Sequence, residues 1–362
     1  MQNTLDKPLL YIIIILLVGG LLILASSSLA LSYKNFGILH YYILKQILFG
    51  ALVGIVALFG TLLIPYRFWK KLAVPMMITS LILLALLFMP ELGYSSGGAK
   101  RWLQFGPLIF QPSEILKFSF IIYLASWLDV RRQEVASISQ GMMPFVIMLG
   151  IVGIFLIMQP DVGTLGVIIF TAAILYFLGG GRMYQMITLF TFGLVILYFL
   201  IQMAPYRLAR ILVFFNPGFD SQGAGYQISQ ALIAIGSGGF FGLGFGKGLQ
   251  KYSYLPEPMG DSIFAIFSEE MGFLGALILI CFFAFLFWRG LYIAKHAPDT
   301  FGKLLAAGIS VGIMVQTFIN TAAISGLLPL TGIPLPFISY GGTSLAVTLA
   351  SMGVLLNISK HI

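Results

Sequence analysis

The chain has 362 residues, of which 59% are hydrophobic and 9% are charged, with a formal net charge of +8. Soluble domains are about half apolar and a quarter charged, and disordered segments are poor in apolar residues, so this composition excludes both classes. The single cysteine, Cys281, excludes an intramolecular disulfide, a zinc site with several Cys ligands and a CxxC redox pair. At about 20 residues per membrane-spanning helix, the apolar residues fill about ten spans.

The long, unbroken apolar runs predict an all-α, polytopic integral membrane protein, and they argue against the alternating pattern of a β-barrel. We expect residues 1–362 to form one domain, a bundle of ten transmembrane helices. The first run is too long, and too surely followed by others, to be a cleaved signal peptide. The expected spans are residues 10–32, 43–65, 70–90, 113–128, 142–159, 162–180, 184–204, 261–288, 303–325 and 343–359.

Lys and Arg in the short loops predict the orientation of the bundle. One side carries most of them, which places that side and both termini in the cytoplasm. Basic residues beside apolar spans favour contact with anionic lipid head groups over nucleic acid as the partner. The basic residues assigned to the cytoplasmic side are Lys7, Arg67, Lys70, Lys71, Arg131, Arg132, Arg182, Arg289, Lys295, Lys303 and Lys360.

The longest stretch without a span, residues 205–260, then forms an extracytoplasmic loop. Within it, GYQISQALIAIGS has apolar residues at helical spacing, which predicts a short amphipathic or re-entrant helix. The following GGFFGLGFGKG matches neither a dinucleotide motif nor a P-loop, and we interpret it as flexible backbone or close helix packing. Irregular backbone at membrane depth is tolerated where it lines a wet cavity, so we expect a cavity open to the outer leaflet near this loop.

Carboxylates are rare and are concentrated on the expected outer side. Asp261 and Glu269, at the start of the eighth span, are eight residues apart, so we expect them to share a helix face that points into the bundle or a cavity. Asp261 also fits a simple helix cap beside Ser262, and Asp161 in QPDVGT fits a turn residue and cap. The eight outer carboxylates are Glu91, Glu114, Asp161, Asp220, Glu257, Asp261, Glu269 and Glu270.

The loop before the fourth span, GAKRWLQFGPLIFQPSEILK, brings polar and basic side chains together. QPSE is typical of a helix start. Lys117 follows Glu114 by three residues, so an ion pair is one account of both. Lys117 also lies well inside an apolar span, and a Lys or Arg that faces an outer cavity suits a phosphate or pyrophosphate.

Three long segments carry a resemblance to a known family. They are GAKRWLQFGPLIFQPSEILK, the stretch from GAGYQISQ to FSEEMGF, and GLLPLTGIPLPFISYGGTSL with the terminal LLNIS. Together they resemble the SEDS family (shape, elongation, division and sporulation), with members FtsW, RodA and SpoVE. The likeness covers nearly the whole chain in order. The GxGxGxGxxQKxxYLPEP stretch and LLNIS resemble FtsW more than RodA, which favours cell division over elongation.

The resemblance implies a peptidoglycan glycosyltransferase of the bacterial cytoplasmic membrane, with its active site facing outward. Such enzymes polymerise lipid II, a disaccharide-pentapeptide on undecaprenyl pyrophosphate, into β-1,4 glycan strands. They work with a cognate class B penicillin-binding protein and with other membrane proteins of the divisome or elongasome. The sequence requires no cofactor. A divalent cation (Mg or Mn) that bridges a carboxylate and the pyrophosphate is compatible with it, although no set of ligand residues demands one.

The family's essential aspartate closes a His-Thr-Asp motif, and the aligned residues here are Met259, Gly260 and Asp261. The aspartate is present, whereas the His and Thr are replaced. The resemblance therefore implies that Asp261 is the catalytic base. The substrate or pyrophosphate set that we predict is Lys117, Arg101, Trp102, Gln111, Glu114, Arg207 and Arg210, with Asp161 and Glu269 in support.

Two other functions use the same features. A lipid II flippase would need important charges on both faces along a transport path, and the outer bias of the carboxylates weighs against it. A non-catalytic scaffold for the penicillin-binding protein would not need Asp261, so Asp261→Asn would leave its function intact. A RodA-type elongation polymerase differs from the division enzyme in its setting and not in its chemistry.

Overall fold

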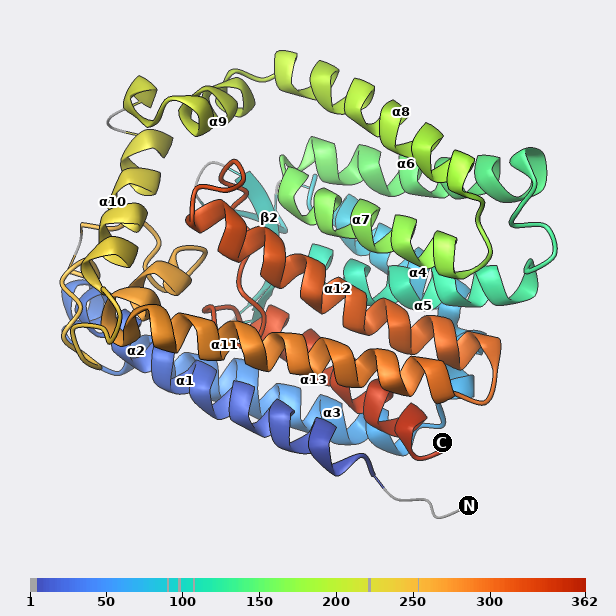
Figure 1. Ribbon diagram of the computed structural model, residues 1–362, viewed down its shortest axis with the longest axis horizontal. Coiled ribbons are helices and arrows are strands. Elements are labelled where there is room, and N and C mark those ends of the chain that lie inside the picture. Colours follow the sequence, from blue (N-terminus) through green and yellow to red (C-terminus); the bar gives the residue numbers. More distant parts are fainter. Residues whose placement is uncertain (1–4, 90, 97–98, 107, 221–222, 253) are drawn as a thin grey trace.

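The computed structural model describes residues 5–362 except residues 90, 97–98, 107, 221–222 and 253. Within this part of the chain, eight helical segments are long and apolar enough to cross a membrane (Figure 1). They are α1 (Lys7–Phe36), α2 (Tyr41–Lys45) with η1 (Gln46–Leu52) and α3 (Val53–Leu63), α4 (Tyr66–Leu86), η2 (Ile138–Met142) with α6 (Met143–Met158), α8 (Met183–Gln202), α11 (Ile263–His296), α12 (Thr300–Ile324) and α13 (Gly342–Ser359).

Two further helices occupy the remaining expected spans. The helix α7 (Val162–Leu178) is apolar but only 17 residues long. The helix α5 (Pro112–Val130) has 19 residues and carries Glu114, Lys117 and Asp129. All ten predicted spans thus coincide with helices, and the prediction of an all-α polytopic membrane protein is confirmed.

The start of α1 and the end of α13 lie at the same end of the bundle, opposite the end that carries α10 (Figure 1). Two ion pairs involve residues that the sequence analysis assigned to the cytoplasmic side. Arg289 Nη2 lies 2.6 Å from Asp6 Oδ2, and Lys70 Nζ lies 2.5 Å from Asp129 Oδ2.

The helices α12 and α13 form the centre of the bundle, and most of their residues are buried. α13 packs on α3 through small residues: a Cβ on Gly54 would lie 2.6 Å from Leu349 Cδ1, and one on Gly353 would lie 2.3 Å from Leu58 O. Dispersion and close backbone approach drive such packing in lipid. By contrast, α8 lies along the edge of the bundle, and Gln185 is its one buried residue.

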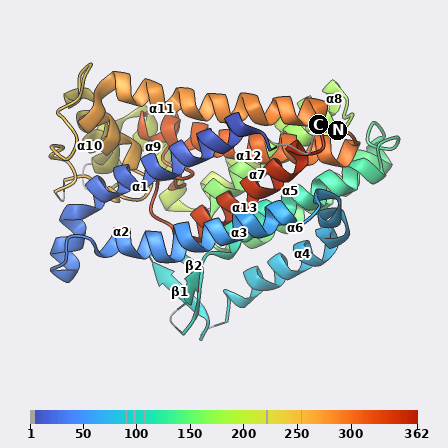
Figure 2. The ribbon, with the colours of Figure 1, turned by 90° about the horizontal axis from the view of Figure 1, so that it is seen from below.

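A small antiparallel sheet, which the sequence analysis did not predict, links α4 to α5. Its strands β1 (Gly93–Ser96), β2 (Ala99–Phe105) and β3 (Leu108–Phe110) are ordered β1-β2-β3. Tyr94 pairs with Trp102 across β1 and β2. Figure 2 shows β1 and β2 protruding from the side of the bundle. Two of the three strands, β1 and β3, have only four and three residues, too few for a clear alternation of apolar and polar residues.

Helices make up much of the described part of the long loop. The helix α10 (Ala224–Ser237) confirms the helix predicted there, and it follows α9 (Pro205–Phe215) and the 3₁₀ turn η3 (Pro217–Asp220). After α10 comes a glycine-rich loop, which we define as residues 238–251. The segment 252–262 then leads into α11, which is broken at Gly272, where φ is 65° and ψ is −168°.

Candidate active site

Asp261 lies in the turn before α11. Ser262 occupies the N-cap position and makes no side-chain cap bond. The Asp261 carboxylate instead accepts hydrogen bonds from Gln227 Nε2 of α10, at 3.2 and 3.3 Å, and from Ser262 Oγ at 3.4 Å. The helix-cap interpretation of Asp261 is therefore wrong. The prediction that Asp261 and Glu269 share a helix face is also wrong, because α11 begins only at Ile263.

The main chain of the triplet 259–261 is held by its carbonyl groups. Tyr340 N donates to Met259 O at 2.8 Å, and Ser339 Oγ donates to Gly260 O at 2.6 Å. Asn320 Nδ2 donates to Asp261 O at 2.9 Å. None of these bonds uses the side chains at positions 259 and 260, so this support of Asp261 is the same whether Met and Gly or His and Thr stand there.

The electrostatic surroundings of Asp261 suit a proton acceptor. Burial, together with the field of Glu257, raises the pKa of the Asp261 carboxyl from 3.8 to about 6, against the opposing effects of Gln227 and Arg210. Desolvation disfavours the charged form of a carboxyl, which is the dominant effect here. A base with a pKa just below neutral is ionised at physiological pH and still accepts a proton readily.

Arg210 provides positive charge near this carboxylate, and Arg101 lies within electrostatic reach of Arg210. Burial lowers the pKa of the Arg210 guanidinium, as does the charge of Arg101, whereas the charge of Asp261 raises it. Arg210 Nη1 donates to Leu330 O at 3.0 Å. Arg101 Nη2 donates to Pro160 O, and its buried Nε has no hydrogen-bond partner among the described residues. A buried, unpaired N–H is costly, so it is available to an anionic ligand.

Asp161 and Gln111 belong to the support of this region. Asp161 Oδ1 accepts from Thr164 N at 3.3 Å and so caps α7, as predicted. Its Oδ2 accepts from Ser113 Oγ at 3.1 Å, and Gln111 Nε2 donates to Ser113 Oγ at 3.0 Å. These bonds join the start of α5 to the turn that receives Arg101.

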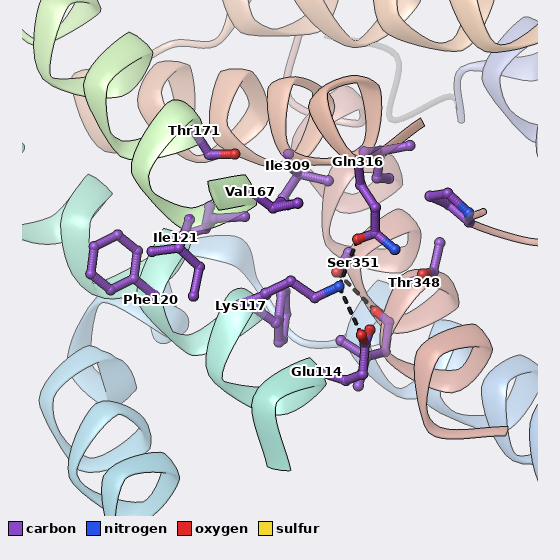
Figure 3. Close-up of a pocket in the computed structure, with 16 residues that line it drawn as sticks. Glu114, Lys117, Phe120, Ile121, Val167, Thr171, Ile309, Gln316, Thr348 and Ser351 are labelled. Carbon is purple, nitrogen blue, oxygen red and sulfur yellow. Dashed lines mark hydrogen bonds and ion pairs between the residues drawn. The ribbon is translucent and has the colours of Figure 1, made fainter. Parts of the chain in front are cut away.

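Lys117 and Glu114 form an ion pair inside the bundle (Figure 3), as the spacing predicts. Lys117 Nζ lies 2.9 Å from Glu114 Oε1 and donates to Gln316 Oε1 at 2.6 Å. The side chains are 12% and 3% exposed. They line a cavity of about 50 Å³ between α5, α7, α12 and α13, which has room for a few water molecules.

Two amides on α12 connect the Lys117 pair to Asp261, and sequence reasoning missed both. Gln316 Nε2 donates to Pro334 O at 2.8 Å, and Asn320 Nδ2 donates to Ile333 O at 2.7 Å as well as to Asp261 O. The residues are four apart and so one helical turn apart on the same face. The signal in the sequence was present: amides in a membrane span hydrogen-bond across helices.

The remaining predicted residues make their contacts elsewhere. Glu269 accepts from Leu249 N at 2.8 Å, in the glycine-rich loop. Arg207 donates to the hydroxyl of Tyr206 and to Leu200 O, both at 2.9 Å. Trp102 is half-buried on β2. A substrate role for Arg207 and Trp102 stays a prediction.

The described residues contain no group of three or more His, Cys, Asp or Glu side chains placed to hold a metal ion. A divalent cation bound by one carboxylate would need pyrophosphate oxygens and water as its other ligands, which is a common arrangement for Mg²⁺.

Fold and site together define a multi-pass membrane protein with a candidate acid–base centre at one end of its helical bundle. A family model described as "Cell cycle protein", FTSW_RODA_SPOVE, matches residues 7–362. The chain belongs to this FtsW/RodA/SpoVE family.

Relatives of known name resemble the chain over most of its length. Stage V sporulation protein E of Bacillus subtilis (strain 168) is 40% identical over 324 residues, which cover 89% of this chain and 87% of that protein. The probable peptidoglycan glycosyltransferase FtsW of Geobacter sulfurreducens (strain DL-1 / KN400) is 39% identical over 337 residues, covering 93% and 90%.

Two solved structures share the fold. One is described as "Structural coordination of polymerization and crosslinking by a peptidoglycan synthase complex"; its matching chain has a TM-score of 0.83 and 26% identity, with 99% of this chain and 98% of that chain covered. The other is the rod shape determining protein RodA of Thermus thermophilus, with a TM-score of 0.72, 26% identity and the same coverage.

Proposed function

We propose that this protein is a peptidoglycan glycosyltransferase that polymerises lipid II into β-1,4 glycan strands during cell division. The observation that carries the proposal is the half-buried Asp261 carboxylate, which accepts hydrogen bonds from Gln227 and lies within electrostatic reach of Arg210, whose charge in turn interacts with that of Arg101. Family membership and the names of the relatives support the same activity.

The proposed step is one inverting displacement. Asp261 accepts the proton of the acceptor sugar 4-hydroxyl as its oxygen attacks the anomeric carbon of the donor. The new C–O bond forms as the bond from the anomeric carbon to the pyrophosphate oxygen breaks. The donor linkage is α and the product linkage is β. The electron pair of the broken bond leaves with the lipid pyrophosphate, and the proton on Asp261 passes to water.

Cations stabilise the leaving group, so that no general acid is required. We assign this role to Arg101 and Arg210, because the two guanidinium groups lie within electrostatic reach of each other and the buried Arg101 Nε has no hydrogen-bond partner in the described part of the chain. Lys117 is held by Glu114 and Gln316 in the adjoining cavity. Lys117 therefore either binds the pyrophosphate or only stabilises the bundle through its ion pair with Glu114. The variants Lys117→Met and Lys117→Met/Glu114→Gln separate these two roles.

The setting of the reaction follows from the charge pattern. We place both termini in the cytoplasm, and Asp261 on the outer side of the bacterial cytoplasmic membrane. A class B penicillin-binding protein is the proposed partner, since a structural relative belongs to a complex that coordinates polymerization and crosslinking. The division role is favoured over elongation by the FtsW-like motifs and by FtsW relatives at 39% identity.

The test is polymerisation of labelled lipid II by the purified protein, alone and with its penicillin-binding protein, in wild type and Asp261→Asn. We expect glycan chains from the wild type, and a loss of about 100- to 10,000-fold in a normally folded Asp261→Asn protein, the usual range for a general base. Equal polymer from both would remove Asp261 from the chemistry. No polymer from either would favour the flippase or scaffold, which lipid II translocation and penicillin-binding protein activation assays distinguish.

A further inference from the structure

Helix α11 loses two of its own hydrogen bonds at Gly272. In an unbroken helix, the carbonyl of Glu269 would accept from the N–H of Phe273, and that of Glu270 from the N–H of Leu274. The non-helical φ and ψ of Gly272, 65° and −168°, prevent both bonds. Unpaired main-chain groups cost several kcal/mol each in a membrane, so a break of this kind persists only where other groups replace the lost partners.

The glycine-rich loop replaces all four partners. Leu243 N and Gly244 N donate to the carbonyls of Glu269 and Glu270, at 3.0 Å each. Gly239 O and Phe240 O accept from the N–H groups of residues 273 and 274, at 2.9 and 3.1 Å. The loop is therefore inserted between the two parts of α11. The main-chain groups on either side of the break are hydrogen-bonded because the loop supplies their partners.

Glycine is required for this approach. A Cβ on Gly238 would lie 2.1 Å from Ser268 O, and one on Gly242 would lie 2.1 Å from Glu270 O. Gly242 also has a φ of 81°, which side chains other than glycine rarely adopt. Of the two interpretations of GGFFGLGFGKG, flexible backbone and close helix packing, these contacts support close packing.

Two adjacent carboxylates on the first part of α11 hold the rest of the loop. Glu269 Oε1 accepts from the N–H groups of Leu249 and Gln250, at 2.8 and 3.3 Å. Glu270 Oε2 accepts from Gly246 N at 3.0 Å. Side-chain carboxylates that bind several main-chain N–H groups fix a loop firmly, because charged acceptors make the stronger hydrogen bonds.

A buried ion pair completes the attachment. Lys251 Nζ lies 2.7 Å from Glu270 Oε1 and donates to Gly246 O at 2.8 Å. Ser26 Oγ of α1 donates to Glu270 and accepts from Lys251 at 3.0 Å. The side chains of Lys251 and Glu270 are 0% and 4% exposed. Removal of one partner of such a pair leaves an uncompensated buried charge.

The segment 252–262 that carries Asp261 is attached to this assembly at both ends. It starts directly after Lys251 and ends at the first turn of α11. We propose that Lys251, Glu269 and Glu270 are positioning residues for Asp261, because they set the direction of the first part of α11 through the glycine-rich loop. The proposal rests on the function proposed above, in which Asp261 is the base.

A purely stabilising role is the alternative, and the pH profile of polymerisation separates the two. Loss of folded protein lowers the rate at every pH and leaves the midpoint unchanged. A displaced Asp261 loses the burial that raises its pKa, so the acidic midpoint moves down from about 6. Glu257 and Arg210 are the charged groups whose fields act on Asp261, and neither is altered in the variants.

The variants are Glu270→Gln, Lys251→Met and the milder Glu269→Gln, with Lys247→Met as control. Lys247 lies in the same loop and is exposed, so its replacement removes the same charge without touching the ion pair. Rates are measured with lipid II and the penicillin-binding protein between pH 5 and 8, per folded molecule. Hydrogen exchange is followed at the amides of residues 243, 244, 249 and 250.

For Glu270→Gln and Lys251→Met we expect a loss of about 10- to 100-fold, the usual effect of a displaced catalytic group. We also expect a lower acidic midpoint and faster exchange at the four amides, whereas Lys247→Met matches the wild type. Folded variants with the wild-type rate and midpoint, or a reduced rate with an unchanged midpoint, would overturn the proposal. If Glu270→Gln fails to fold, the polymerisation rate, acidic midpoint and amide exchange of Glu269→Gln test the proposal in the same way.

A wild-type protein that makes no polymer would instead refute the proposed function. The exchange data would then still decide whether the ion pair holds the loop on α11, and unchanged protection in Glu270→Gln would reject that attachment.

Discussion

Asn320 donates one side-chain N–H group to the carbonyl of Asp261 and one to the carbonyl of Ile333, at 2.9 and 2.7 Å. Because both neighbours are acceptors, the orientation of the amide is determined: Nδ2 must face them. Its Oδ1 is buried without a partner among the described residues. Asn320 therefore joins the turn of the candidate base to the segment after α12.

We predict that Asn320→Asp is more harmful than Asn320→Ala. The carboxylate places a negative charge against two carbonyl oxygens, whereas alanine only removes two hydrogen bonds. Each bond contributes about 1 kcal/mol, and a buried unpaired charge costs more. Thermal unfolding in detergent, followed together with polymerisation rate, measures the order. A stable, active Asn320→Asp protein would mean that this contact does not hold the Asp261 turn.

Asp261→Asn should stabilise the fold above pH 6 while it removes activity. The folded pKa, about 6, exceeds the ordinary value of 3.8. The folded state therefore binds more protons between these values, and wild-type stability falls as pH rises from about 4 to about 6. The shift corresponds to an upper limit of about 3 kcal/mol.

Unfolding midpoints of both proteins from pH 4 to 8 check this expectation. The gap between Asp261→Asn and wild type should open with rising pH and level off above pH 6. A gap independent of pH would contradict the raised pKa. The wild-type polymerisation rate should rise through the same range, since the ionised carboxylate is the active form.

Lys117→Met and the double variant Lys117→Met/Glu114→Gln separate an internal ion pair from a pyrophosphate site. The single change leaves the Glu114 carboxylate buried and unpaired, which destabilises by about 3–5 kcal/mol. The double change removes that charge, so stability should return. If Lys117 binds pyrophosphate, polymerisation stays low in the double variant. Recovery of both stability and activity would assign Lys117 to the bundle alone.

Gly242→Ala and Gly246→Ala form a matched pair in the glycine-rich loop. The two glycines have φ values of 81° and 80°, so alanine meets the same strain of about 1–3 kcal/mol at either position. Only at Gly242 does the new Cβ meet Glu270 O, at 2.1 Å. We expect a larger loss of unfolding midpoint for Gly242→Ala. Equal losses would argue against insertion of the loop into α11.

Eight of the ten spans were predictable because each is a run of residues long and apolar enough to cross a bilayer, and the other two, α5 and α7, because they too are mainly apolar. A signal of that kind is local. Asp261, Arg101 and Lys117 could also be singled out from the sequence, because charged residues are so few in this chain. The residues that hydrogen-bond to Asp261 could not be predicted. Gln227 lies 34 residues from Asp261, and Asn320 lies 59 residues away, so only the tertiary fold brings them together.

The break in α11 shows a second limit. Gly272 stands in an apolar run, and glycine is common in membrane helices that pack without interruption. Its non-helical conformation depends on the loop 30 residues earlier, whose Gly242 N–H and neighbours occupy the space. For the same reason Glu269 was expected at the site, whereas its carboxylate binds main-chain N–H groups of the glycine-rich loop. Periodicity predicted the helix face of Glu269 but not the segment that packs against that face.

The carbonyl-based support of residues 259–261 also bears on how such proteins diverge. Main-chain oxygens are common to all amino acids, so mutation at positions 259 and 260 leaves these hydrogen bonds intact as long as the backbone keeps its course. The residues at positions 259 and 260 can then change in evolution while the aspartate at position 261 is retained. Searches that demand the full His-Thr-Asp signature would pass over this protein, whereas a search for the aspartate in its structural frame would recover it.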